Sequence, residues 1–215
     1  MGLTENLPTE ILNEIFSYFQ DIQDFTTLNT LRQVCRQWQQ VIDIPSRWQV
    51  IFMNRPLSVQ QLKRYMHAHR PFIHRLTLHQ VKDEMLRHVL TDYPALEYLC
   101  VTQWTTLTHH SFRLFKYGHI RQLVLVGGNK DPFLALDAPA LVRLLEMCPL
   151  ITCLDIQQCL MPIKSIQSVI KALQTNPIQS RIESLTLPIQ YPCTHSERLL
   201  LGQYLPSLTY LHLLV

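Results

Sequence analysis

The stretch LEYLCV, at residues 96–101, decides the fold because its spacing of apolar residues returns along most of the chain. The same frame, an apolar residue followed three and five positions later by two more, occurs at 73–78, 120–125, 151–156, 182–187 and 208–213. Its middle leucines are separated by 23, 24, 31, 31 and 26 residues. One frame recurring at such intervals is typical of a tandem repeat array. The sequence therefore predicts stacked repeats over residues 72–215.

Segments with one apolar helical face lie between several of these frames. Residues 81–91, 137–147 and 163–173 place apolar side chains three or four positions apart. A proline follows each segment shortly before the next frame, where it ends a helix. A short strand and a helix cannot bury their apolar sides alone, so stacked units share one core. We expect an α/β solenoid with a parallel sheet on its concave face and helices outside.

The frames, with phrases such as Tyr-Pro-Ala-Leu and Cys-Pro-Leu-Ile, resemble leucine-rich repeats, about six of them. Period-two alternation sends the residues between the leucines to the concave face. The predicted substrate-binding residues are Arg75, Thr77, His79, Tyr98, Thr102, Gln122, Val124, Val126, Asp155, Gln157, Thr186, Tyr210 and His212. A tyrosine among uncharged neighbours suits a protein partner. For any single residue the alternative is that a sheet surface simply favours β-branched and aromatic side chains.

Loops beside the frames were weighed as further contacts for a partner. Gln103 with Trp104, and residues 188–195, lie at the rim of the predicted concave face and are expected to add contacts. The alternative for Trp104 is a ring folded back onto the core. Residues 127–132, GGNKDP, lack the spacing of a phosphate-binding loop and are expected to form an ordinary turn.

The N-terminal stretch LPTEILNEIFSYFQDIQDFTTLNTLRQVCRQWQQVIDIPSRW covers residues 7–48. Its apolar residues follow a helical period from Pro8 to Phe19 and again from Leu31 to Ile42. The mostly polar residues 20–23 predict a turn, and therefore two packed helices. A unit of about forty residues buries only a modest share of its surface, so some of its large apolar side chains should form an exposed patch that binds a partner.

The same stretch resembles the F-box motif, through Leu7-Pro8, Glu10-Ile11, Ile15-Phe16-Ser17-Tyr18, Val34-Cys35, Trp38 and Trp48. It departs from that motif at Phe19, where leucine is usual, and in a longer span between Tyr18 and Val34. With the repeats, the chain resembles F-box proteins with C-terminal leucine-rich repeats. The resemblance implies an F-box at residues 5–50 that binds a Skp-family adaptor and, through it, cullin and RING subunits. The expected adaptor-binding residues are Leu7, Pro8, Ile11, Ile15, Phe19, Val34, Cys35 and Trp38.

Residues 51–71 are expected to form a helical linker between the F-box and the repeats. Val59, Leu62 and Met66 are spaced for a short amphipathic helix, and Ser58 is a candidate N-cap. His67, His69, Arg64 and Arg70 are interpreted as a solvated helix face rather than as a ligand site.

These observations favour a substrate-recognition subunit of an SCF-type ubiquitin ligase. The alternative is a non-degradative F-box protein or a leucine-rich-repeat scaffold for protein interactions. No GxSxG, HExxH or paired-carboxylate pattern occurs, and the ten histidines are scattered, so we expect a non-catalytic protein without a cofactor.

Composition excludes several other classes. The formal charge is only +3 and Lys and Arg form no block, which argues against nucleic-acid binding. The six cysteines form no CxxC pair and predict neither a metal site nor disulfides. No signal core or run of 18 apolar residues occurs, which predicts no membrane span and a cytoplasmic or nuclear location. No polar terminal repeat follows residues 208–213, so we expect a shortened family member or an end covered by a partner or a second copy.

Overall fold

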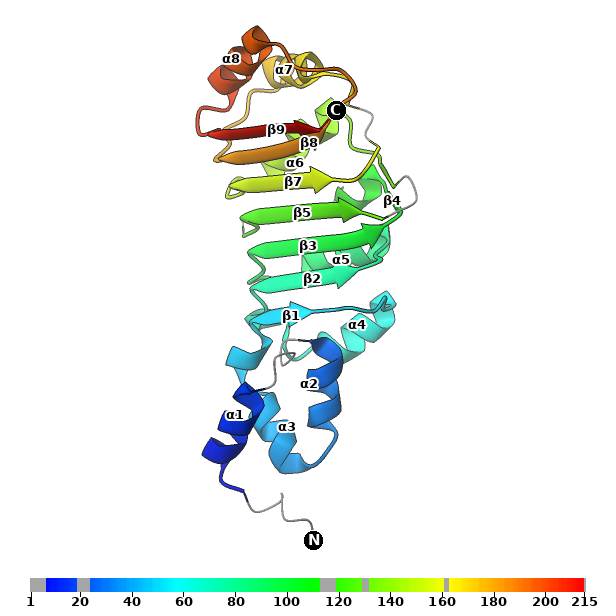
Figure 1. The fold of residues 1–215 in the computed structure, drawn as a ribbon, viewed down its shortest axis with the longest axis vertical. Coiled ribbons are helices and arrows are strands. Elements are labelled where there is room, and N and C mark those ends of the chain that lie inside the picture. Colours follow the sequence, from blue (N-terminus) through cyan, green and yellow to red (C-terminus); the bar gives the residue numbers. More distant parts are fainter. Residues whose placement is uncertain (1–6, 19–23, 113–118, 129–131, 161–162, 215) are drawn as a thin grey trace.

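The computed structural model describes residues 7–18, 24–112, 119–128, 132–160 and 163–214. The molecule is elongated, with a helical unit at its N-terminal end and a long stack of strands above it (Figure 1). The two termini lie at opposite ends of this stack.

One parallel sheet organises the molecule. Its strands are β1 (Val50–Phe52), β2 (Arg75–His79), β3 (Tyr98–Trp104), β5 (Gln122–Gly127), β7 (Cys153–Gln157), β8 (Ser184–Pro188) and β9 (Tyr210–Leu214). They lie in the order β1-β2-β3-β5-β7-β8-β9, and every neighbouring pair is parallel. Each of the six predicted frames supplies one strand, so the expected parallel sheet is confirmed. The stretch between β3 and β7 also holds two short paired strands, β4 (Thr106–Leu107) and β6 (Phe133–Leu134), and the 3-10 helix η4 (His109–Phe112).

The strands are stacked in one register by a repeated backbone contact. The His74 carbonyl accepts hydrogen bonds from the N–H groups of Glu97 and Tyr98, both within 3.0 Å. In the same way, the carbonyls of Gln49, Glu97, Arg121, Thr152 and Glu183 accept two N–H groups from the start of the neighbouring strand in the sheet. The middle leucines of the frames consequently pair across the whole sheet, from Leu76 to Leu211. The spacing of the frames therefore becomes a column of leucines in space.

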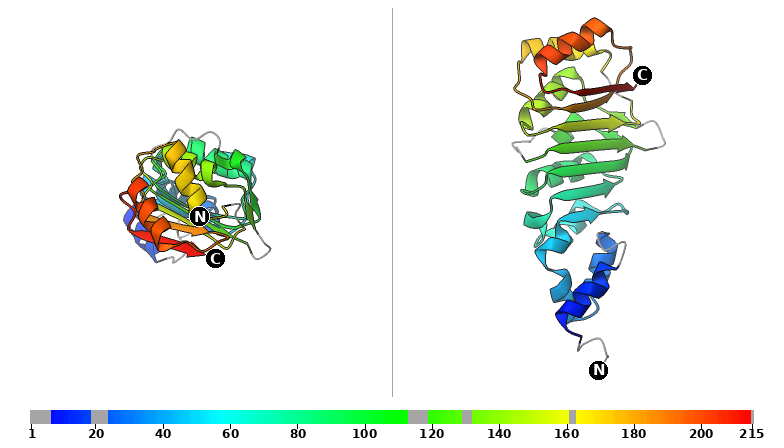
Figure 2. Two further views of the ribbon diagram at one scale, coloured as in Figure 1. Left: turned by 90° about the horizontal axis from the view of Figure 1, so that it is seen from above. Right: turned by 60° about the vertical axis from the view of Figure 1, so that its left-hand side comes forward.

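Helices cover one face of this sheet. The predicted helical segments appear as α5 (Asp83–Asp92), α6 (Ala138–Met147) and α7 (Ile166–Thr175), and their leucines, isoleucines and valines are buried. These helices form a layer beside the strands (Figure 2). No described helix lies over the opposite face, which we call the open face; its residues are those of β2 to β9 that alternate with the buried leucines.

The sequence did not predict helix α8 (His195–Tyr204), which lies at the C-terminal end of the stack. Only Leu201 of this helix is buried, while Leu199 and Leu200 remain exposed, so its apolar pattern is weak. Thr194 and Glu197 form a capping box that fixes its first turn. Local capping, more than a buried face, defines this helix.

The N-terminal unit has three α-helices instead of the two predicted: α1 (Thr9–Ser17), α2 (Phe25–Arg32) and α3 (Arg36–Ile42), followed by the 3-10 helix η2 (Pro45–Trp48). The chain turns between α2 and α3, where Cys35 is extended at the N-cap of α3. A continuous helix over 25–42 would be about 27 Å long and unable to fold back on itself. The turn lets α2 and α3 pack together and bury Leu28 and Val41. The predicted turn at 20–23 lies outside the described residues.

The segment predicted as a helical linker contains more than a helix. Helix α4 (Val59–Met66) is present, with the predicted Ser58 cap as part of a capping box. Strand β1, however, lies partly within the same segment and pairs with β2, so the sheet begins before residue 72. His69 also differs from the prediction, because it is 4% exposed and stacks on Trp48 with ring centroids 3.7 Å apart. The helical unit and the sheet are therefore joined by packed side chains.

Candidate functional site

Helix α1 has one buried and one exposed apolar stripe. Leu12 and Phe16 are buried, and Phe16 packs edge-on against Trp38 with ring centroids 4.9 Å apart. Ile11, Ile15 and Tyr18 are 44%, 39% and 76% exposed. Residues spaced by four and three positions lie on the same side of a helix. This exposed stripe, Ile11, Ile15 and Tyr18, is an apolar surface that the fold of the unit itself does not need.

The remaining predicted adaptor-binding residues divide into exposed and supporting groups. Pro8 and Val34 are exposed, and Val34 lies two residues before the start of α3, the helix against which α1 packs. Leu7 and Trp38 are half-buried and pack against the core, and the Gln37 side chain donates a hydrogen bond to the Leu7 carbonyl. Cys35 is half-buried at the turn between α2 and α3. Phe19 lies outside the described residues.

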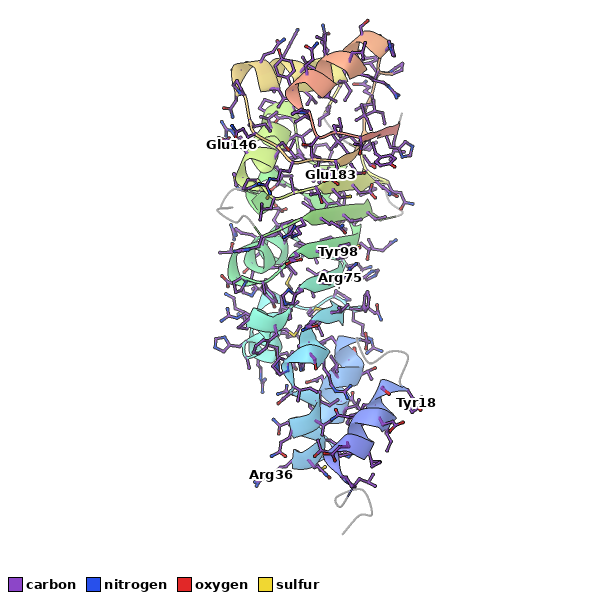
Figure 3. The ribbon with its side chains drawn as sticks, turned by 90° about the vertical axis from the view of Figure 1, so that its left-hand side faces the viewer. Tyr18, Arg36, Arg75, Tyr98, Glu146 and Glu183 are labelled. Atoms are coloured by element: carbon purple, nitrogen blue, oxygen red, sulfur yellow. The ribbon has the colours of Figure 1, made fainter. Side chains whose placement is uncertain are left out.

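Sequence reasoning left Tyr18 out of the adaptor-binding set. Its 76% exposure makes it the most open of the three side chains on the stripe, and it projects from α1 on the side of the unit away from Arg36 (Figure 3). The helical period places Ile11, Ile15 and Tyr18 on one face of α1 and Leu12 and Phe16 on another, but the tertiary structure decides which of these faces packs against α3.

A cluster of packed side chains around Trp48 lies where the helical unit meets the sheet. The Trp48 ring is fully buried, and its Nε1–H donates to the Ile42 carbonyl at 2.9 Å. Arg32 pairs with Asp43 at 2.5 Å, and its guanidinium lies over the Trp48 ring. His69, from the segment after α4, stacks on that ring. Burial lowers the pKa of His69 to about 4, so this imidazole is neutral at pH 7.

The open face carries all thirteen residues predicted for the concave surface, each of them exposed or half-buried. They form rows across the strands: Arg75, Tyr98, Gln122 and Tyr210 in one, Thr77, Val124, Asp155, Thr186 and His212 in the next, and His79, Thr102, Val126 and Gln157 in a third. The parallel register brings these rows together, which spacing alone does not show.

Charge is sparse on this face. The Arg75 guanidinium lies 4.5 Å from the centre of the Tyr98 ring, and both residues project from neighbouring strands (Figure 3). Burial raises the pKa of the Tyr98 hydroxyl, which is therefore a neutral hydrogen-bonding group at pH 7. Two strands beyond Tyr98, Asp155 Oδ2 accepts a hydrogen bond from Gln157 Nε2 at 2.8 Å, while its Oδ1 is buried without a hydrogen-bond partner among the described residues.

Of the two interpretations of Trp104, the rim contact is wrong and the ring folded onto the core is confirmed. Its side chain is fully buried, because β3 bulges between Thr102 and Trp104 and the indole turns into the core. Gln103, at the bulge, has a left-handed φ of 55° and a half-buried side chain. The bulge exchanges the sides on which these two residues would otherwise lie. The GGNKDP turn at 127–132 falls partly outside the described residues.

Metal sites, membrane-spanning helices and paired cysteines were each considered within the described ranges. Within the described ranges, no three His, Cys, Asp or Glu residues lie close enough to hold a metal ion. In the same ranges, no helix combines the length and apolar character needed to cross a bilayer. All six cysteines are unpaired; Cys148 is buried, and burial raises its thiol pKa to about 12. The other five are half-buried.

Comparison with protein families bears on the N-terminal unit. No curated protein matches the chain. Residues 4–54 match the family model described as F-box-like, a span that includes α1, α2, α3 and the whole of β1. F-box domains are typically non-catalytic adaptors. The exposed stripe on α1 and Trp48 with its partners Arg32 and Asp43 therefore lie in the F-box-like match, whereas His69 lies outside it.

Proposed function

We propose that the chain is a substrate-recognition subunit of an SCF-type cullin–RING ubiquitin ligase. The observation that carries this proposal is the exposed stripe of Ile11, Ile15 and Tyr18 on an F-box-like domain. Contiguous exposed apolar side chains usually mark a protein-binding site. In this proposal the stripe, with Pro8 and Val34, docks a Skp-family adaptor, and Leu7, Trp38 and the Trp48 cluster hold the helices in place.

The open face is the proposed substrate-binding surface, built from leucine-rich repeats. Support comes from the six frames, from their parallel pairing in one register and from the absence of any described helix over this face. Tyr98 and Tyr210 offer aromatic anchors beside the apolar Val124 and Val126. Arg75 is the main cation there and already lies against the Tyr98 ring, which favours a substrate that does not depend on a phosphate group.

In this proposal the chain brings the substrate close to the subunits that transfer ubiquitin. Ubiquitin transfer takes place on other subunits, which the adaptor links to the F-box-like domain. The elongated fold separates the two binding surfaces along one axis, with the packed contact of His69 on Trp48 between them. A stiff connection keeps a bound substrate at a fixed position relative to the ligase, which raises its effective concentration. We propose that the protein works in the cytoplasm or nucleus, where those subunits act.

Affinity purification tests the proposal. The parent chain is compared with the double variant Ile11→Ala, Ile15→Ala, and with Leu160→Ala as a control at a leucine that is 57% exposed outside the F-box-like domain. The parent and control should retain a Skp-family adaptor and a cullin, and the double variant should lose both. A parent chain that retains the adaptor without cullin would favour the non-degradative alternative, and one that retains neither would reject the proposal.

A further inference from the structure

Three glutamines mark the carboxyl ends of the open-face strands. Gln80, Gln103 and Gln158 have φ angles of 53°, 55° and 50°, and within the described residues they are the non-glycine positions with left-handed φ. Each follows the last open-face residue of its strand, His79, Thr102 or Gln157 in turn, and these three belong to one row of the sheet. We call the three glutamines the glutamine rim.

The left-handed conformation is unfavourable for glutamine. A side chain at positive φ is crowded by its own backbone, and glycine or asparagine is the usual residue there. Three strained residues of the same type at equivalent positions are unexpected if only the turn matters, because glycine would form the turn without strain. The turn itself brings the next residue, Val81, Trp104 or Cys159, towards the core, and the choice of glutamine at all three turns is the feature used below.

The side-chain amides of these glutamines are available. Gln80 and Gln158 are exposed, Gln103 is half-buried, and the three side chains make no hydrogen bond within the described part of the protein. The rim is also uncharged, since residues 79–81, 102–104 and 157–159 contain no Asp, Glu, Lys or Arg. A primary amide both donates and accepts hydrogen bonds. It therefore complements a peptide group, which has the same two functions.

The dimensions of the rim fit an extended peptide. Neighbouring strands of a sheet lie about 4.8 Å apart, so the rim, which spans β2, β3, β5 and β7, is about 14 Å long. Four residues of extended chain cover that length at about 3.4 Å each. Val126, next to the rim on β5, adds an apolar side chain beside such a segment.

We infer that the glutamine rim selects the partner of the open face, and that it takes an uncharged, extended polypeptide segment through hydrogen bonds from its side-chain amides to peptide groups. This inference rests on the proposed function, because it names the chemistry of the substrate at the surface proposed above. The rim sets specificity, and the tyrosines and valines of the open face add apolar contact.

The test uses the full chain bound to a Skp-family adaptor and a displayed library of random eight-residue peptides. Peptides selected on the parent complex should be mostly uncharged over four consecutive positions. Their Kd should rise at least tenfold for the triple variant Gln80→Gly, Gln103→Gly, Gln158→Gly. The matching triple asparagine variant, which keeps an amide and accepts the left-handed conformation, should recover part of the affinity.

A thermal melt of the same variants separates recognition from structure. The triple glycine variant should melt at the parent temperature or higher, because glycine relieves the strain at positive φ. Unchanged peptide affinity in that variant, or a lower melting temperature, would overturn the inference, and so would selection of acidic or phosphorylated peptides. Adaptor binding is measured in parallel, so loss of the adaptor from the parent chain reports failure of the proposed function instead.

Discussion

Replacing Ile11 and Ile15 together with alanine should weaken adaptor binding by a calculable amount. Their exposed fractions are 44% and 39%, so about two fifths of each side chain remains to be buried in a complex. Complete burial of an isoleucine side chain contributes roughly 1.5 to 3 kcal/mol, which scales to about 1 kcal/mol for each residue and about 2 kcal/mol for the pair. Since 1.4 kcal/mol corresponds to a factor of ten, the Kd should rise about 30-fold.

Isothermal titration calorimetry of the purified chain with a Skp-family adaptor measures this change. The melting temperature should stay close to that of the parent, because Leu12 and Phe16 supply the buried side of α1 and are not altered. Leu160→Ala should change neither quantity. An adaptor affinity within threefold of the parent, in a double variant that folds normally, would refute the assignment of the stripe as the docking surface.

Further predictions concern stability. Trp104→Ala should lower the free energy of unfolding by about 3 to 5 kcal/mol in urea titrations, because the indole is fully buried; a weaker partner contact with unchanged stability would contradict its place in the core. Gly127→Ala should destabilise, since the added Cβ would lie 2.0 Å from the Gln158 carbonyl oxygen, whereas Gly202→Ala, with open space around it in α8, should stabilise by up to about 1 kcal/mol in thermal melts. Stability should also fall as the pH drops from about 6.5 towards 4, because His69 has its pKa lowered to about 4 in the folded chain and the unfolded chain binds the proton first. His69→Gln should reduce this pH dependence, and an unchanged slope would show that other groups cause it.

The repeated frame was sufficient to predict every strand of the sheet except β1. The strands at residues 76–78, 99–101 and 154–156 are where the spacing places them, because each leucine must be buried against the unit before and after it. The helices α5, α6 and α7 followed from the same argument, since each has a strong apolar face. Helix α8 was missed because it buries only Leu201, and a periodicity argument detects burial rather than capping.

The site was predicted less completely, for reasons of geometry. The sequence identified Ile11 and Ile15 and the open-face residues by their period, but it could not show that Tyr18 shares the exposed stripe without a decision on which side of α1 faces α3. For Trp104 it left two readings open, a rim contact and a ring folded onto the core, since the choice depends on the bulge after Thr102.

By itself the sequence determined the parallel sheet, the side of each strand that carries exposed residues and the F-box-like character of residues 4–54, because these follow from local spacing and motif. Only the tertiary structure decided the break between α2 and α3, the inclusion of β1 in the sheet and the stacking of His69 on Trp48. It also revealed that three glutamines share one strained conformation on one edge of the sheet. The physical reason is that burial of apolar surface and backbone pairing between distant segments outweigh local preference wherever the two conflict.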